Sequence, residues 1–122
     1  MRRILLFIVG VGAGNTTRTL AWAEELKRLD PEIDLQIAAQ GKAFELLSNH
    51  FPVHEMVTVD YGSAEEMSAF SIIKNNLGFL SRFRENQKRA AKLIRDLKPD
   101  LVVADSDFYC LGPAKRSGVF LV

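Results

Sequence analysis

Apolar residues along the chain gather in short runs that alternate with longer amphipathic stretches. The runs are rich in β-branched and aliphatic residues, whereas the stretches between them repeat apolar residues at helical spacing. This alternation is typical of β-α-β units and predicts a doubly wound, Rossmann-like α/β fold with a parallel sheet flanked by helices. The predicted strands are Ile4–Val9, Ile33–Ala38, Val53–Val59, Leu101–Ala104 and Val119–Val122.

The helical stretches are bounded by recognisable stop signals. The first is expected to end at Leu29, because the residue before Pro31 avoids the helical conformation. The longest is expected to break or bend at Gly78, and it is strongly basic beyond that point. For the basic part we favour a solvated helix face over a functional surface. The predicted helices cover about residues 16–29, 42–49, 64–97 and 108–115.

Composition narrows the class of protein. The chain has 122 residues, of which 48% are hydrophobic and 25% charged, which fits one soluble globular domain over residues 1–122. A net charge of +1 gives no reason to expect a nucleic acid partner. Cys110 is the only cysteine, so an internal disulfide framework is excluded and a reducing, cytoplasmic compartment is expected. No cluster has metal-ligand spacing, and we predict no metal site.

Apolar runs lie at both ends of the chain. Arg2-Arg3 followed by the apolar run Ile4–Val9 also resembles a secretory signal, but the glycine turn and helix that follow favour a buried strand. No other apolar run approaches the roughly 20 residues that span a bilayer. Val119–Val122 resembles the start of an interior strand, and we therefore expect the chain to be one domain of a longer protein.

The segment after the first predicted strand contains three glycines within five residues, Gly10 to Gly14. Glycines let a backbone turn sharply and approach a ligand, and a helix N-terminus after them attracts anionic groups. Asn15 or Thr16 could cap that helix, and a tight structural turn is the alternative interpretation. The predicted substrate-binding residues are Gly12, Gly14, Asn15, Thr16, Thr17 and Arg18.

Two common nucleotide motifs are absent from this loop. A dinucleotide fingerprint needs a third glycine where Ala13 or Asn15 stands, and an acidic residue after the second strand, where the sequence has Ala39-Gln40-Gly41. A phosphate loop needs Gly-Lys-Ser/Thr, which does not follow the glycines. Nicotinamide-dependent and nucleoside-triphosphatase functions are therefore disfavoured.

The loop and a later run resemble one family. Gly12, Gly14, Thr17 and Arg18, followed by a helix rich in Leu, Ala and Glu, are similar to the opening of GT-B glycosyltransferases. The resemblance is strongest to the group that contains the peptidoglycan N-acetylglucosaminyltransferase and the UDP-glucuronosyltransferase-like proteins. Lys98–Asp105 is similar to that family's Lys-Pro-Asp-hydrophobic-Ser-Asp segment. The resemblance extends from the first residue to about residue 107.

This resemblance implies the N-terminal, acceptor-side domain of a two-domain enzyme. The absent C-terminal domain would hold most of a nucleotide-sugar, expected to be UDP-linked, which is a co-substrate; no other cofactor is implied. Several relatives use a loop histidine as general base, and Asn15 stands at that position, where a carboxamide cannot accept a proton usefully. Asp105, at the end of a strand on the ligand-binding edge, is the predicted catalytic residue, and Asp107 is a second candidate. Capping of the following helix is the alternative role of both.

The predicted function is transfer of a sugar from a nucleotide-sugar to an acceptor hydroxyl, with the isolated chain inactive. A nucleotide-sugar 2-epimerase of the same fold and a non-catalytic binding module remain as alternatives. His50 and His54 are interpreted as surface or loop residues. A lipid-linked acceptor would bring the basic helix to the inner membrane face, together with the apolar residues Leu77, Phe79, Leu80 and Phe83. We favour a solvated helix face over this peripheral membrane contact.

Overall fold

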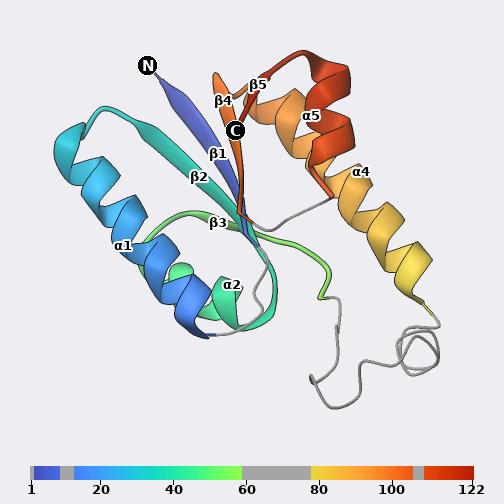
Figure 1. The fold of residues 1–122 in the computed structure, drawn as a ribbon, viewed down its shortest axis with the longest axis horizontal. Helices are drawn as coiled ribbons and strands as arrows, with labels where there is room; N and C mark the ends of the chain where they lie inside the picture. The colour runs from blue at the N-terminus through green and yellow to red at the C-terminus, as the bar shows by residue number, and fades with distance from the viewer. Residues whose placement is uncertain (1, 9–12, 59–77, 106–108) are drawn as a thin grey trace.

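In the computed structural model the described elements form three layers, with a parallel sheet between α1 and α2 on one side and α4 and α5 on the other (Figure 1). It describes residues 2–8, 13–58, 78–105 and 109–122. The described strands pair in parallel in the order β3-β2-β1-β4-β5. The predicted doubly wound α/β fold is therefore confirmed. The strands are β1 (Arg3–Ile8), β2 (Asp34–Ala39), β3 (Val53–Glu55), β4 (Leu101–Asp105) and β5 (Phe120–Leu121).

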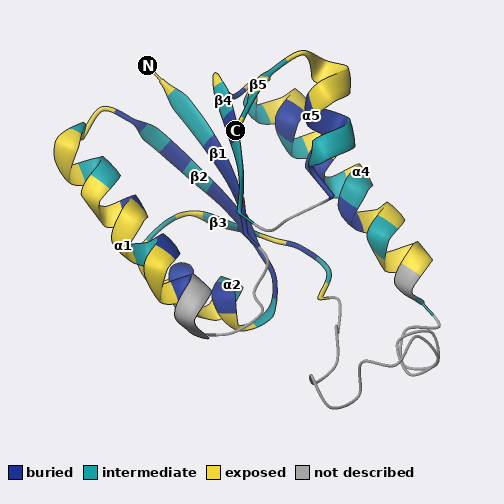
Figure 2. Ribbon diagram, in the orientation of Figure 1, coloured by how far each residue is buried: buried dark blue, intermediate teal, exposed yellow. Residues whose placement is uncertain are grey.

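The helices divide between the two faces of the sheet. α1 (Ala13–Leu29) and α2 (Gly41–Leu47) cover one face, whereas α4 (Phe79–Leu97) and α5 (Leu111–Ser117) cover the other. The alternation of side chains along β1 feeds both cores. Leu5 and Phe7 pack in the cluster on the α4 side, and Leu6 and Ile8 in the cluster on the α1 side. Figure 2 shows the resulting buried strands between helices with exposed outer surfaces.

The first helix begins earlier than the sequence predicts. α1 starts at Ala13 and not at about Thr16, so Gly14 and Asn15 belong to its first turn. Asn15 and Thr16 therefore do not occupy the N-cap position, and that expectation was wrong. The first turn is where glycine and polar residues are least harmful, because its N–H groups have no partners within the helix.

The third strand is shorter than the predicted Val53–Val59. β3 ends at Glu55, although the N–H of Met56 still donates to the carbonyl of Ala39, at 2.8 Å. At Val57 the backbone leaves the sheet and bonds with a side chain of α4 instead. Val59 lies outside the described residues, so the end of the predicted strand is not tested there.

The other boundaries agree with the pattern to within a few residues. α4 begins directly after Gly78, as predicted, and the earlier part of the long helical stretch, residues 64–77, lies outside the described residues. α5 begins at Leu111, later than the expected residue 108. Pro113 fits its first turn, because a missing N–H there costs no helical hydrogen bond.

Paired polar groups hold the amino ends of the strands together. The backbone N–H of Arg3 donates to Asp100, at 2.8 Å, and its guanidinium donates to Asp34, at 2.6 Å, and to the carbonyl of Leu97. Hydrogen bonds from Gln36 and Arg3 hold the pKa of Asp34 below its usual range. These polar groups pair with one another, so they stabilise this end of the sheet and have a structural role.

Candidate functional site

The carboxyl ends of β1 and β4 form the topological switch point of the sheet. From β1 the chain proceeds to β2 on one side, and β4 lies on the other side, with Ile8 paired to Asp105. The crossover helices consequently lie on opposite faces, which opens a crevice beyond these two strands. Figure 1 shows the start of α1 at this end of the sheet. The side chains that meet there come from α1 and β4.

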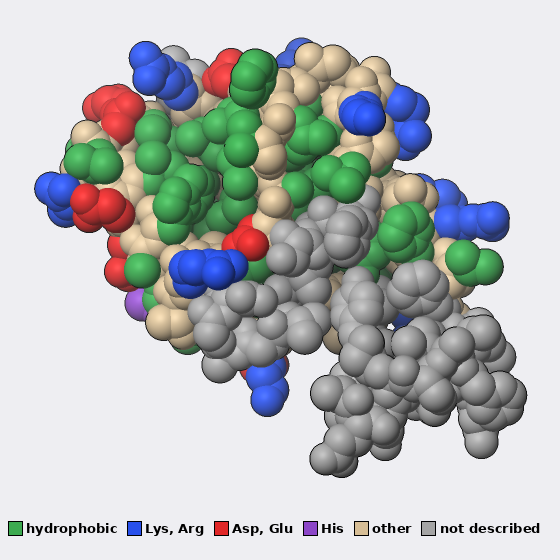
Figure 3. All heavy atoms as spheres, viewed as in Figure 1, with side chains coloured by type: hydrophobic (Ala, Val, Ile, Leu, Met, Phe, Trp, Pro, Cys, Tyr) green, Lys and Arg blue, Asp and Glu red, His purple; other side chains and the backbone are tan. Residues whose placement is uncertain are grey.

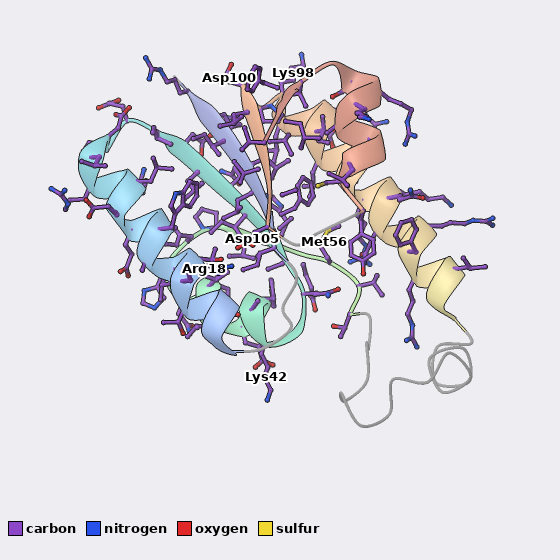
Figure 4. The ribbon with its side chains drawn as sticks, in the orientation of Figure 1. Arg18, Lys42, Met56, Lys98, Asp100 and Asp105 are labelled. Carbon is purple, nitrogen blue, oxygen red and sulfur yellow. The ribbon has the colours of Figure 1, made fainter. Side chains whose placement is uncertain are left out.

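Asp105 meets two residues of α1 at this point. One carboxylate oxygen, Oδ2, accepts a hydrogen bond from the hydroxyl of Thr19, at 3.1 Å. The other, Oδ1, lies 3.4 Å from the Arg18 guanidinium. Figure 4 shows Arg18 beside Asp105, at the end of the sheet opposite to Asp100. Three residue types suited to hydroxyl and anion recognition therefore converge from two elements that are distant in sequence.

The two contacts of Asp105 differ in strength. Thr19 is buried, so its hydroxyl holds one carboxylate oxygen in place. The side chain of Arg18 is 67% exposed, and an exposed ion pair contributes at most about 1 kcal/mol in water. The guanidinium can therefore exchange this partner for an anionic ligand group at little cost, because such groups accept its paired N–H donors.

A groove of about 290 Å³ opens next to this cluster. Its polar end consists of Arg18, Thr19 and Asp105. The remaining lining is mostly apolar and comprises Leu6, Trp22, Val103 and Ala104. Such an arrangement suits a ligand with one hydroxylated or charged end and one apolar face.

The other residues predicted to bind the substrate differ in their burial and position. Thr16 is buried on α1, whereas Thr17 and Arg18 are exposed. Gly14 and Asn15 lie on the first turn of α1, and Gly12 lies outside the described residues. Their contact with a substrate stays a prediction.

The helix-capping role considered for Asp105 was wrong. α5 begins six residues later, at Leu111, and its N-cap position is Cys110, without a side-chain cap. Asp105 instead belongs to β4, where its side chain lies on the same face as Val103. Asp107 lies outside the described residues, so neither of its possible roles is tested.

Sequence reasoning missed Thr19 and Trp22. Thr19 follows Thr16 by three positions and therefore shares its helix face, and both are buried. That spacing was a usable signal for a polar stripe facing the sheet. Trp22 lies three residues further along and lines the groove, although it is 42% exposed.

The two histidines stand apart from this cluster. His50 is exposed, with Nδ1 4.0 Å from Glu24. His54 belongs to the edge strand β3, where its Nε2 lies 2.9 Å from Oε1 of Gln36. Burial lowers the pKa of His54, which favours a neutral ring that donates to Gln36. His54 is therefore not a loop residue, but it stays partly exposed at the edge of the sheet.

The fold and the groove define an α/β protein of the doubly wound class, with a candidate ligand site at the switch point of its sheet. Residues 2–122 match the model of the glycosyl transferase family 1 proteins, and the chain belongs to this family. An uncharacterized glycosyltransferase from Methanosarcina mazei is 32% identical over 112 residues. That alignment covers 90% of this chain and 28% of the relative.

Solved structures confirm the fold resemblance. MurG from Acinetobacter baumannii superimposes with a TM-score of 0.65 at 17% identity, over 99% of this chain and 34% of that protein. The glycosyltransferase VinC, solved with DTDP, gives 0.61 at 13% identity over 98% and 33%, respectively. A UDP-N-acetylglucosamine 2-epimerase gives 0.60 at 16% identity over 98% and 32%. The chain thus spans about a third of each of these structures.

Proposed function

We propose that the full-length protein transfers a sugar from a nucleotide-sugar donor to an acceptor hydroxyl, and that residues 1–122 form its acceptor-side domain. The observation that carries the proposal is the cluster of Arg18, Thr19 and Asp105 at the switch point of a chain in a glycosyltransferase family. The chain covers 34% of MurG, and we propose that a second domain, outside residues 1–122 of the full-length protein, holds the donor. The two substrates would meet between the domains.

Each residue of the cluster has a distinct role in this proposal. The Asp105 carboxylate orients the acceptor hydroxyl and takes its proton as the oxygen attacks the sugar carbon. The bond from that carbon to the nucleotide diphosphate breaks in the same reaction. Thr19 fixes the carboxylate through its hydroxyl, and Arg18 binds an anionic group of a substrate. The glycine loop and the start of α1, from Gly12 to Thr17, border the acceptor.

Asp105→Asn in the full-length protein tests this assignment. The amide oxygen still accepts from Thr19, so the fold is expected to persist, while loss of the base lowers kcat about 100-fold to 10,000-fold. Release of nucleoside diphosphate from UDP-sugars and dTDP-sugars with candidate acceptors measures the rate. Asp100→Asn, at the opposite end of β4, is the matched control and should retain the parent rate. An unchanged kcat in Asp105→Asn would remove Asp105 from the chemistry.

A nucleotide-sugar 2-epimerase is the second candidate function. The observation that favours it is the fold similarity to a UDP-N-acetylglucosamine 2-epimerase, at a TM-score of 0.60. An epimerase would invert the configuration at C2 of the sugar in UDP-N-acetylglucosamine without any acceptor. A transferase would release one nucleoside diphosphate for each acceptor molecule that it glycosylates. NMR of the sugar nucleotide after incubation with the full-length protein distinguishes the two. The similarity to this enzyme and to VinC with DTDP also supports a pyrimidine nucleotide in the donor, which we propose to be UDP.

A cytoplasmic location, with peripheral contact at an anionic membrane, is the remaining part of the proposal. None of the described helices is long and apolar enough to cross a membrane. The outward side of α4 carries four exposed cations, Arg84, Lys88, Lys92 and Arg95. Leu80 is exposed near the same side, but Phe83 packs against Tyr109, with ring centroids 5.1 Å apart. Phe83 is therefore not the membrane-facing residue that the sequence suggested.

Vesicle sedimentation separates membrane contact from a purely solvated helix. Each cation near an anionic surface contributes about 1 kcal/mol, and salt screens that attraction. We expect the protein to cosediment with phosphatidylserine vesicles at low salt. Cosedimentation should weaken at high salt, and it should also weaken in the double variant Arg84→Glu/Lys88→Glu. Lys42→Glu, an exposed charge reversal on α2, is the control and should leave binding unchanged. A protein that stays in the supernatant at low salt would leave α4 as a solvated surface.

A further inference from the structure

The outer edge of β3 carries main-chain groups that no other described strand uses. β3 is the last strand on its side of the described sheet. The N–H of Met56 donates to the carbonyl of Ala39 on β2, and His54 faces β2 in the same way, because alternate residues of a strand bond to the same neighbour. The N–H and carbonyl groups of Val53 and Glu55 therefore point away from the sheet. Such an edge is a template for a strand of another chain.

Side chains of α4 close part of this edge. Nη1 of Arg89 donates to the outward carbonyl of Glu55, at 2.9 Å, and Nε of Arg89 lies 3.4 Å from Glu85, which holds the guanidinium in place. One turn earlier, Asn86 bonds with the N–H and the carbonyl of Val57, the next outward position. Basic side chains elsewhere on this side of the molecule project into solvent, as Figure 3 shows over α4 and α5. Arg89 differs from them because it turns back onto the main chain of an edge strand.

A groove of about 630 Å³ lies along the same edge, and Arg89 is part of its lining. Its apolar lining comes from both faces of the sheet. Phe44 and Val53 pack with the core on the α1 side, whereas Leu93 and Leu97 pack with the core on the α4 side. A strand added to β3 would therefore bury apolar surface as well as form main-chain hydrogen bonds.

Two copies of β3 match each other in one antiparallel register. When His54 of one chain lies opposite His54 of a second chain, Val53 of each chain faces Glu55 of the other. Each of these pairs can exchange both of its main-chain hydrogen bonds, because the N–H and carbonyl groups of both residues point outward. The Glu55 carbonyl accepts one bond of each pair, and it is the group that Arg89 occupies. Self-pairing of β3 therefore requires the guanidinium to leave.

We propose that Arg89 keeps the outer edge of β3 closed against a second copy of the protein. The side chain is 41% exposed and contacts the carbonyl that an added strand would need. Short edge strands and charged side chains at the edge are two common protections against pairing. β3 has three residues, so the arginine adds the second protection to the first. The inference concerns association alone and is independent of the proposed sugar transfer.

Arg89→Ala in the full-length protein tests this role by sedimentation velocity over a range of concentrations. The matched control is Arg95→Ala, on the same helix, where the side chain is 73% exposed and pairs with Asp96. Arg89→Ala should self-associate at least about tenfold more tightly than the parent, because the Glu55 carbonyls of both copies gain strand partners. Arg95→Ala should associate as the parent does. Hydrogen exchange followed by mass spectrometry should slow at residues 53–55 as Arg89→Ala is concentrated.

A second substitution ties the association to β3. Glu55→Pro removes an outward N–H that does not bond to β2, and proline is tolerated at such edge positions. In the Arg89→Ala background it should return association to the level of the parent. Unchanged association in Arg89→Ala would overturn the inference, and so would a gain that persists in Arg89→Ala/Glu55→Pro or that leaves exchange at β3 unchanged. Arg89→Leu, which keeps an apolar stem, replaces Arg89→Ala if circular dichroism shows that the latter does not fold.

Discussion

Asn86 shows how one residue fixes the path of the chain after β3. It is fully buried on α4, where its side chain forms two hydrogen bonds with the backbone of Val57. The N–H of Val57 donates to Oδ1, at 2.8 Å, and Nδ2 donates to the carbonyl, at 2.9 Å. The side-chain amide thus replaces the neighbouring strand that Val57 lacks once the backbone has left β3.

Asn86→Ala is therefore expected to destabilise the protein more than most polar substitutions. It leaves an N–H and a carbonyl of Val57 without their side-chain partner in a part-buried setting, and a buried group left unsatisfied costs up to about 1–3 kcal/mol. Urea unfolding followed by circular dichroism measures the change. Asn49→Ala removes the same side chain at an exposed position and should change stability by less than about 0.5 kcal/mol. Similar losses in both variants would contradict a special role for the Val57 contacts.

Two helices end in the left-handed conformation with different residues. Lys98 ends α4 with φ at 49°, and Gly118 ends α5 with φ at 75°. A side chain at such a position costs about 1–2 kcal/mol, which glycine avoids. The two caps therefore form a matched pair in which opposite substitutions should have opposite effects.

Lys98→Gly is expected to raise the free energy of unfolding by about 0.5–1 kcal/mol, because the lost strain exceeds the entropy that glycine loses on folding. Gly118→Ala should lower it by about 1 kcal/mol. A Cβ at Gly118 would meet nothing within 4 Å, so backbone conformation alone accounts for that loss. Chemical denaturation of both variants measures the effects. A destabilised Lys98→Gly would show that the lysine side chain contributes more than its backbone costs.

At the scale of the whole molecule, we expect the isolated chain to lack transferase activity. The proposed donor domain is missing from it, and bringing two substrates together supplies a large part of catalysis. Its exposed large apolar side chains, such as Trp22 and Phe120, would also favour self-association, which light scattering at rising concentration detects. Assays of nucleoside diphosphate release with the purified 122-residue chain and with the full-length protein make the comparison. Turnover by the short chain alone would refute the two-domain proposal.

The sequence by itself determined the fold class and most elements. Apolar runs marked every described strand, because a parallel sheet with helices on both faces needs apolar side chains on both sides of its strands. Pro31 and Gly78 marked a helix end and a helix start, because their backbone preferences act on adjacent residues. The end of β4 at Asp105 was also foreseeable, as a carboxylate directly after an apolar run.

Tertiary structure decided the features that depend on contacts between distant segments. The sequence did not show that Thr19 and Arg18 would meet Asp105, 86 and 87 positions away. It did not show that Val57 would leave the sheet for Asn86, which shortened β3, or that Trp22 would line a groove. Hydrophobic periodicity reports the local geometry of each element, whereas strand order and crossover handedness determine which elements become neighbours. The site belongs to that second level, since it exists only where α1 and β4 are packed together.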